Sequence, residues 1–351
     1  MSVELFLRRM PKVELHVHLE GAMRPGVLLE LARRNGVDLP AGDEEGLRNW
    51  FRFRDFEHFV QVYLTCSRAL RRPEDFKLLA LDFVEAQAGQ GVVYTETHFT
   101  ISTHLANGGN GDEILAALEE AMAEGERRFG SRLRLIPDIV RNVGVEAADR
   151  TLEWAVAGRS RGVVALGLSG SESRFPSEPF REHFEIAARE GLRRVAHAGE
   201  HAGPESIRSV LEVCGAERVG HGVRAVEDPA LVVELCDRHI PLEVCPSSNV
   251  CLGVFPDVES HSFDRLYRAG VPVSVNSDDP AFFDTDLSRE YLRLHEAFGY
   301  TPAELAGLSL AALRQSFLPE GEKAALEADF RQRMDELSRE LLGSGFAHPL
   351  S

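Results

Sequence analysis

The sequence predicts a (β/α)8 barrel of the TIM type, formed by one domain over residues 1–351, with extra helices between the first and second strands. Three observations support this fold class. Short β-branched runs alternate with longer stretches of helical spacing, which is typical of parallel strands joined by crossover helices. Eight such runs occur, the number that closes a barrel. Polar residues end several runs, where barrels of this class build their active sites.

The eight predicted strands lie at residues 12–19, 91–97, 133–140, 162–168, 193–197, 217–221, 241–245 and 271–277. In the first, Lys-Val-Glu-Leu-His-Val-His-Leu, apolar and polar residues alternate with the two-residue period of a strand. Most of the others are apolar and β-branched, as in Gly-Val-Val-Ala-Leu-Gly-Leu at 162–168. The segment between the first two strands exceeds one crossover connection, so we expect the extra helices there.

Apolar residues at helical spacing predict helices between the strands. We expect one core face from Phe56, Phe59, Val60, Tyr63 and Leu64, and another from Ile114, Leu115, Leu118 and Met122. Asp112 and Thr301 are the expected N-caps, and Thr301 opens a capping-box pattern, Thr-Pro-Ala-Glu. We assign the aromatic and methionine side chains of these faces to the core.

Composition narrows the classes of function. The net charge of −17 argues against an extended surface for nucleic acid, so we expect no nucleic-acid partner. Five cysteines without a C-x-x-C pair, and no signal peptide, predict a reducing cytoplasm. No apolar run approaches the length of a membrane span. We therefore expect a cytoplasmic protein that acts on a small molecule, and a homo-oligomer stays open.

Two histidines of the first strand are the first candidate site residues. His16 and His18 are two residues apart, so they project from the same side of the strand. Two imidazoles on one face can hold one metal ion. The alternative is a pair of polar residues on a half-buried strand. The metal interpretation is favoured because later strands also end in histidine or aspartate.

Those later strand ends supply the other candidates. His197 ends one strand, and Glu200 follows in a small-residue turn, so a metal ligand and a proton donor are paired, while the next residue, His201, is expected to be an exposed neighbour. His221 stands between two glycines and is a candidate ligand or base. Alone, it would more often be a structural histidine.

Asp278 and Asp279 end the last strand. One carboxylate can bind a metal while the other faces a substrate, although Asp-Asp-Pro is also a common start of a helix. The run at 162–168 has no lysine that could bridge two metals, which favours a single ion. Ser247, Ser248 and Asn249 either line a pocket or form a turn.

Five motifs together resemble the adenosine/adenine deaminase family of metal-dependent amidohydrolases. They are Glu-Leu-His-Val-His-Leu-Glu-Gly, His-Ala-Gly-Glu, Val-Gly-His-Gly-Val, Glu-Val-Cys-Pro-Ser-Ser-Asn and Val-Asn-Ser-Asp-Asp-Pro. They occur in the order of the family and span residues 12 to 280, most of the chain.

The resemblance implies a ligand set and a reaction. One zinc ion per chain, with Fe²⁺ as the alternative, would be held by His16, His18, His197 and Asp278. An activated water would attack C6 of a 6-aminopurine, and ammonia would leave. Glu200 would protonate ring N1, His221 would take or orient the proton of the water, Asp279 would contact the water and the purine edge, and the backbone N–H of Gly170 would reach ring N3. Because Glu200 must donate a proton, we predict that burial and Asp279 raise its pKa.

The resemblance also bears on the substrate. Many adenosine-specific members have aspartate where this chain has Glu20, and they carry two carboxylates where Gly-Leu-Ser-Gly-Ser-Glu stands at 167–172. Arg174 and Arg68 are candidates to bind a carboxylate on an extended substrate, such as the menaquinone precursor aminodeoxyfutalosine; both also fit a surface role. The inserted helices cover the pocket mouth in the family, so Phe51, Phe53 and Phe56 form either an apolar lid or core packing.

The leading function is therefore zinc-dependent deamination of a 6-aminopurine. An adenosine-like nucleoside comes first, followed by aminodeoxyfutalosine and free adenine. A second hypothesis is a mononuclear amidohydrolase that cleaves another C–N bond. A third is a non-catalytic relative that binds metal or nucleoside, which the presence of Glu200 and His221 disfavours.

Overall fold

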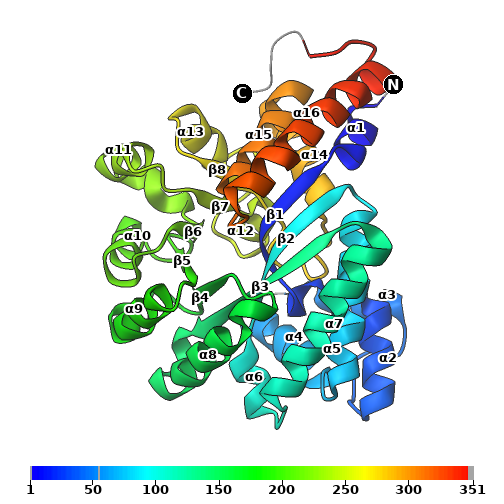
Figure 1. Cartoon of the computed structure of the whole chain (residues 1–351), viewed down its shortest axis with the longest axis vertical. Helices are drawn as coiled ribbons and strands as arrows, with labels where there is room; N and C mark the ends of the chain where they lie inside the picture. The colour runs from blue at the N-terminus through cyan, green and yellow to red at the C-terminus, as the bar shows by residue number, and fades with distance from the viewer. Residues whose placement is uncertain (1, 54–55, 347–351) are drawn as a thin grey trace.

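The computed structural model of the chain describes residues 2–53 and 56–346, and within them eight parallel strands lie side by side in chain order (Figure 1). The strands are β1 (Lys12–His18), β2 (Val92–Phe99), β3 (Arg132–Val140), β4 (Ala165–Ser169), β5 (Arg193–Ala198), β6 (Arg218–His221), β7 (Leu242–Val244) and β8 (Val273–Val275). Each overlaps its predicted range, and the predicted (β/α)8 barrel is confirmed.

The barrel closes between β8 and β1 through a mixture of side-chain and backbone contacts. Asn276 Oδ1 accepts hydrogen bonds from the backbone N–H groups of Leu15 (2.9 Å) and His16 (3.1 Å). One step further, the N–H of His18 donates to the carbonyl of Asp278 (2.7 Å). This explains why β8 ends earlier than predicted: a side chain takes the place of the backbone ladder. The closure also brings Asp278 beside the histidines of β1.

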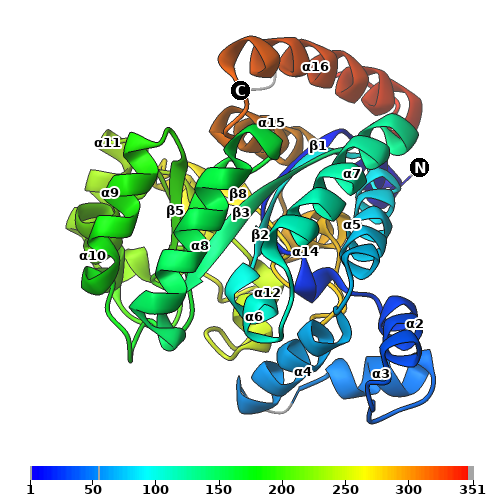
Figure 2. The same cartoon turned by 60° about the horizontal axis from the view of Figure 1, so that its bottom comes forward.

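Helices surround the barrel and also cover its two ends (Figure 2). They are α1 (Val3–Arg9), α2 (Pro25–Asn35), α3 (Glu44–Phe51), α4 (Phe56–Ala69), α5 (Pro73–Ala88), α6 (Ile101–Ala106), α7 (Gly111–Phe129), α8 (Val145–Gly158), α9 (Arg181–Arg189), α10 (Pro204–Ser209), α11 (Pro229–Asp237), α12 (Pro246–Cys251), α13 (Phe263–Arg268), α14 (Leu287–Phe298), α15 (Pro302–Gln315) and α16 (Glu320–Leu342). In the described ranges no helix combines the length and the apolar character needed to cross a membrane.

The expected insertion between the first two strands is present as α2 to α5. In both views α2, α3 and α4 lie at the end of the barrel opposite to α16, which packs against α1 (Figures 1 and 2). Since α1 precedes β1 directly, α16 covers the end where the strands begin, and the inserted helices cover the end where they finish. That is the end at which the candidate site residues were predicted.

Helix predictions were correct for the barrel wall and less accurate for the insertion. The predicted apolar face of α7 is buried, but on α4 Val60 and Leu64 are 36% and 43% exposed. The predicted core face of α4 was wrong in part, because this helix crosses the end of the barrel and only part of its surface is covered. The side chain of Phe56 lies outside the described residues.

The two predicted N-caps had different outcomes. Thr301 forms the capping box with Glu304 at the start of α15, as predicted. The predicted cap at Asp112 was wrong, since Asn110 accepts from the N–H groups of Asp112 and Glu113 and begins α7 two residues earlier. Asparagine is as good an N-cap as aspartate, so the local pattern alone did not separate them.

Candidate active site

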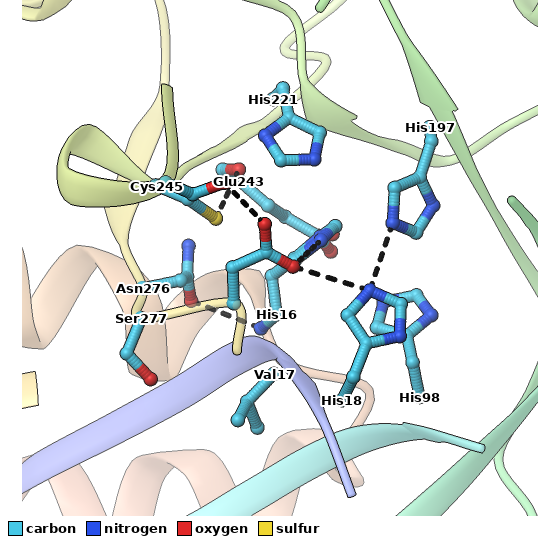
Figure 3. Close-up of polar contacts among 12 residues, drawn as sticks. His16, Val17, His18, His98, His197, His221, Glu243, Cys245, Asn276 and Ser277 are labelled. Atoms are coloured by element: carbon cyan, nitrogen blue, oxygen red, sulfur yellow. Dashed lines mark hydrogen bonds and ion pairs between the residues drawn. The ribbon is translucent and has the colours of Figure 1, made fainter. Parts of the chain in front are cut away.

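Three histidine side chains, from β1 and β5, and one carboxylate, from the segment after β8, converge at the carboxyl end of the barrel; Figure 3 shows the histidines. His18 Nε2 lies 3.2 Å from His197 Nε2 and 3.2 Å from Asp278 Oδ1. His16 Nε2 lies 3.5 Å from the same carboxylate oxygen. All four residues are buried. The structure thus brings together the four strand-end residues that the sequence analysis named, although they are separated by up to 262 positions in the chain.

Outer contacts orient these imidazoles. His16 Nδ1 donates to Glu243 Oε2 (2.9 Å), and His197 Nδ1 donates to the carbonyl of Leu168 (3.0 Å). Both acceptors fix the ring proton on Nδ1, which leaves the Nε2 lone pair directed at the centre. Ser248 Oγ donates to the second oxygen of Asp278 (2.6 Å), so that Oδ1 stays directed inward.

The centre fits a divalent cation. His16 Nε2 is buried and has no hydrogen-bond partner in the protein, which is costly unless it binds something else. Three imidazole nitrogens and one carboxylate oxygen form a ligand set that is typical of zinc. His221 is close to the same cluster: its ligand atom lies within 4.8 Å of those of His16, His197 and Asp278. These residues can therefore hold one metal ion.

The electrostatic potential of the centre favours positive charge. Burial by itself lowers the pKa of His16, but the nearby carboxylates of Asp278 and Glu243 outweigh it and raise the pKa to about 9. Burial also lowers the pKa of His18, and Asp278 outweighs it and raises the pKa to about 10. A site that holds protons this strongly also attracts a metal cation, which competes for the same lone pairs.

A second group of side chains lies beside the metal ligands. Glu200 Oε2 is 3.0 Å from His201 Nδ1 and 3.8 Å from His221 Nε2. The amide nitrogen of Asn249 donates to His221 Nδ1 (3.2 Å), while its oxygen accepts from His261 Nε2 (3.1 Å). This chain of hydrogen bonds leaves the proton of neutral His221 on Nε2, facing Glu200. Glu200 and His221 thus lie on one face of the centre. Asn249, for which the sequence left a pocket or a turn as alternatives, contacts both residues and lines this face.

The predicted pKa shift of Glu200 was wrong. Burial raises its pKa, but His221 and His201 outweigh burial and hold it below its ordinary value. His201, expected to be only an exposed neighbour, is 38% exposed in its side chain and pairs with Glu200. Asp279 does not supply the expected negative charge, because burial and Asp278 raise its own pKa well above the ordinary value.

The absence of a side chain at Gly21 makes room for the side chain of Asp279. A side-chain carbon at Gly21 would lie 1.8 Å from Asp279 Oδ1, so only glycine leaves room for the carboxylate there. Asp279 Oδ1 is buried and has no hydrogen-bond partner in the protein. It lies next to Asp278 in the chain and is therefore available to a molecule bound beside the metal ligands.

Glu20 is buried beneath the inserted helices. Its Oε1 accepts from the N–H of Thr100 (2.9 Å) and from His104 Nε2 (2.9 Å), whereas its Oε2 is buried without a partner. One oxygen is therefore held by the protein, and the other is free to accept from a ligand. Sequence reasoning missed His104, whose contact with Glu20 spans 84 positions.

The remaining substrate-binding candidates lie on loops and at a helix end. Gly170 follows β4 with φ of 94°, a left-handed conformation that favours glycine. Arg174 is exposed four residues later, and Arg68 is exposed near the end of α4, where it donates to Thr65 Oγ1 (3.0 Å). Their roles toward a substrate stay predictions.

An aromatic cluster joins the insertion to the loop after β8. Phe51 packs on Phe282 with ring centroids 5.1 Å apart, and Phe53 packs on Phe283 at 5.7 Å. Phe282 and Phe283 follow Asp279 within four residues, so the cluster lies beside the carboxylate. Phe51 and Phe53 are placed as expected of an apolar cover, and the same contacts serve core packing.

Comparisons with known proteins agree with this geometry. The family model described as adenosine deaminase matches residues 11–332. An aminodeoxyfutalosine deaminase from Streptomyces avermitilis is 38% identical over 326 residues, covering 92% of this chain and 91% of the relative. An adenine deaminase from Bordetella parapertussis is 41% identical over 296 residues, covering 84% and 93%. The crystal structure of an amidohydrolase from Burkholderia ambifaria with bound Zn superposes with a TM-score of 0.90 at 27% identity, covering 98% and 96%.

Proposed function

The chain belongs to the adenosine deaminase family of hydrolases that act on C–N bonds, and on this premise we propose that it is a single-domain, zinc-dependent deaminase of a 6-aminopurine. The observation that carries the proposal is the convergence of His16, His18, His197 and Asp278 with Glu200 and His221 on one side. The proposed reaction adds water at C6 of the purine, releases ammonia and leaves a 6-oxopurine.

The residues divide into three proposed roles. The four ligands hold the ion, which when bound supplies a Lewis acid that acidifies water. Glu200 delivers a proton to ring N1. Because the pKa of Glu200 is held low, we propose that this proton is shared with His201, whose Nδ1 lies 3.0 Å from Glu200 Oε2. Of the two expected roles of His221, taking or orienting the proton of the water, orienting fits the proton that its Nε2 already carries, and Asp279 binds the water and the purine edge. The N–H of Gly170 donates to ring N3.

We predict that metal content depends on Asp278. Purified protein is expected to contain about one divalent ion per chain, and Asp278→Asn is expected to lower the occupancy at least tenfold, because it removes the anionic ligand and leaves the other three neutral. Elemental analysis measures content and separates zinc from iron. Asp237→Asn, which changes an exposed carboxylate on α11, is the control and should retain the metal. Full occupancy in Asp278→Asn would contradict the ligand assignment.

The choice of substrate rests on Glu20 and the arginines. Glu20 Oε2 accepts an N–H or O–H donor on the far side of the purine, which suits adenine and adenosine-like nucleosides alike. Glutamate at this position, and glycine and serine in place of two carboxylates at 167–172, favour aminodeoxyfutalosine and adenine over adenosine. The relatives named for these two substrates support placing both ahead of the adenosine-like nucleoside that the sequence analysis ranked first.

A substrate panel tests the function. Purified, metal-replete enzyme is assayed with adenine, adenosine, deoxyadenosine and aminodeoxyfutalosine by the ultraviolet change and by ammonia release. We expect one substrate to lead in kcat/KM by a hundredfold or more, about 2.7 kcal/mol of transition-state binding. If aminodeoxyfutalosine has the highest kcat/KM, Arg174 and Arg68 are the residues to mutate next. If adenine or adenosine has the highest kcat/KM, the two arginines are interpreted as surface residues without a role in substrate binding. Hydrolysis of another C–N bond, or turnover of none of the four, would contradict the proposal.

A further inference from the structure

Glu172 joins the loop after β4 to the loop after β5. Its side chain is buried, and each carboxylate oxygen accepts two hydrogen bonds. Oε2 accepts from the N–H of Gly199 (2.7 Å) and from Ser206 Oγ (2.6 Å). Oε1 accepts from the N–H groups of Glu200 (3.1 Å) and His201 (3.1 Å). Three successive backbone N–H groups thus form a concave anion site that an internal carboxylate fills.

These contacts use the whole acceptor capacity of the carboxylate. Two carboxylate oxygens offer about four lone-pair positions, and all are taken by the protein. Glu172 is therefore not available to bind a cation or a substrate, even though it lies close to Glu200 and His201. Its contribution is to fix the backbone of the segment that carries Glu200. Charge-assisted hydrogen bonds of this kind are roughly twice as strong as neutral ones.

The two joined loops carry residues that are proposed to contact the same purine. Gly170 lies two positions before Glu172, and the N–H of the intervening Ser171 donates to Asn142 Oδ1 (2.8 Å), which anchors that loop to the short helical turn after β3. On the other side, Gly199 has φ of 67° and turns the chain immediately after β5. A shift of the β5 loop would move Glu200 relative to both the Gly170 N–H and the ligand His197.

We propose that Glu172 is a positioning residue that holds Glu200 in the geometry needed for proton transfer to the substrate. The inference rests on the proposed function, because it assigns Glu172 to the proton donor of that reaction. A carboxylate is required, since the amide of glutamine would place an N–H group against backbone N–H donors and lose two acceptor positions. Glu172 acts through Glu200 and His201 and contacts no reacting atom.

The test is a double-mutant cycle in the metal-replete enzyme. Glu172→Gln is expected to lower kcat by roughly 10- to 100-fold with KM changed less than about threefold, because small misplacements of a catalytic group cost rates of this order. In the Glu200→Gln background the same change is expected to cost less than about threefold, since the group that it positions is already gone. Glu182→Gln, an exposed change at the start of α9, is the matched control.

Equal losses in the two backgrounds would overturn the proposal, and so would wild-type kcat in Glu172→Gln. Where Glu172→Gln lowers the melting temperature or metal content, Glu172→Asp keeps the charge with a shorter reach. It is expected to show a smaller loss of kcat and the same dependence on Glu200.

A second readout does not need turnover. Glu172→Gln is expected to speed hydrogen exchange of the amides of Gly199, Glu200 and His201 at least tenfold, while amides of β5 remain protected. Unchanged exchange at these three amides would overturn the positioning role. If the wild-type enzyme turns over no 6-aminopurine, the proposed function fails in the substrate panel, and the exchange experiment still decides whether Glu172 holds the loop.

Discussion

Glu200→Gln is expected to lower kcat/KM for the preferred 6-aminopurine by roughly 10²- to 10⁴-fold, the range for one general acid–base group. Glutamine keeps the size of the side chain and its contact with Asn249, but it cannot deliver a proton to a ring nitrogen. The effect should fall mainly on kcat, because the lost interaction belongs to the transition state. Steady-state kinetics on enzyme with verified metal content measures it.

A second consequence of Glu200→Gln concerns the neighbouring imidazole. The Glu200 carboxylate raises the pKa of His201 above its ordinary value, so neutralising it is expected to lower that pKa. Titration of the His201 ring by NMR tests the sign without substrate. Glu185→Gln, an exposed change on α9, is the control for kinetics and titration. An active Glu200→Gln enzyme with an unchanged pH–rate profile would remove Glu200 from the reaction.

The proposed metal ligands were accessible to sequence reasoning because of their local pattern. His16 and His18 show the two-residue period of a strand, and His197 and Asp278 stand where β-branched runs end. The topology of a parallel barrel then places such ends together, whatever their separation in sequence. The structure brings these four residues together as that argument requires.

Other parts of the site depended on contacts that no local pattern records. Glu243 and the Asp138 carboxylate near His18 lie within buried strands, where an unpaired charge is costly, and that signal could have marked them as partners of the histidines. Glu172 and His104 lack such a signal because neither lies in a strand: Glu172 is in the loop after β4, and His104 is on α6. The pKa of Glu200 was mispredicted because it depends on which way His201 points.

A buried chain of charges extends from the metal ligand His16 toward the opposite end of the barrel. Glu243 accepts from His16 through Oε2 and from Arg218 Nε through Oε1 (2.5 Å). Arg218 also pairs with Glu96 Oε2 (2.6 Å), and its guanidinium lies 3.7 Å from the ring centroid of Phe317. Burial raises the pKa of Glu243, but Arg218 and His16 outweigh it and hold the pKa at about 2. One guanidinium thus pairs with two carboxylates inside the barrel.

Arg218→Met is expected to destabilise the protein by about 3–5 kcal/mol at pH 7, because it removes the cation that these two buried carboxylates share. Thermal unfolding of wild type, the variant and the exposed control Arg189→Met measures the effect, and the control is expected to stay within about 0.5 kcal/mol. Adding Glu96→Gln to Arg218→Met should recover part of the loss by removing one unpaired charge.

The sign of the pH dependence separates lost pairing from lost packing. In the wild type the folded pKa of Glu243 lies below its unfolded value near 4.3, so its contribution is present above that value and is lost as pH falls toward about 2. Without Arg218 burial is expected to raise the folded pKa of Glu243 above the unfolded value, so protonation of Glu243 stabilises the folded variant as pH falls. The deficit of Arg218→Met should therefore shrink between pH 7 and pH 5, whereas a pure cavity would cost the same at both. A deficit that is independent of pH would show that Arg218 stabilises the barrel by filling space, and that the orientation of His16 does not depend on this chain of charges.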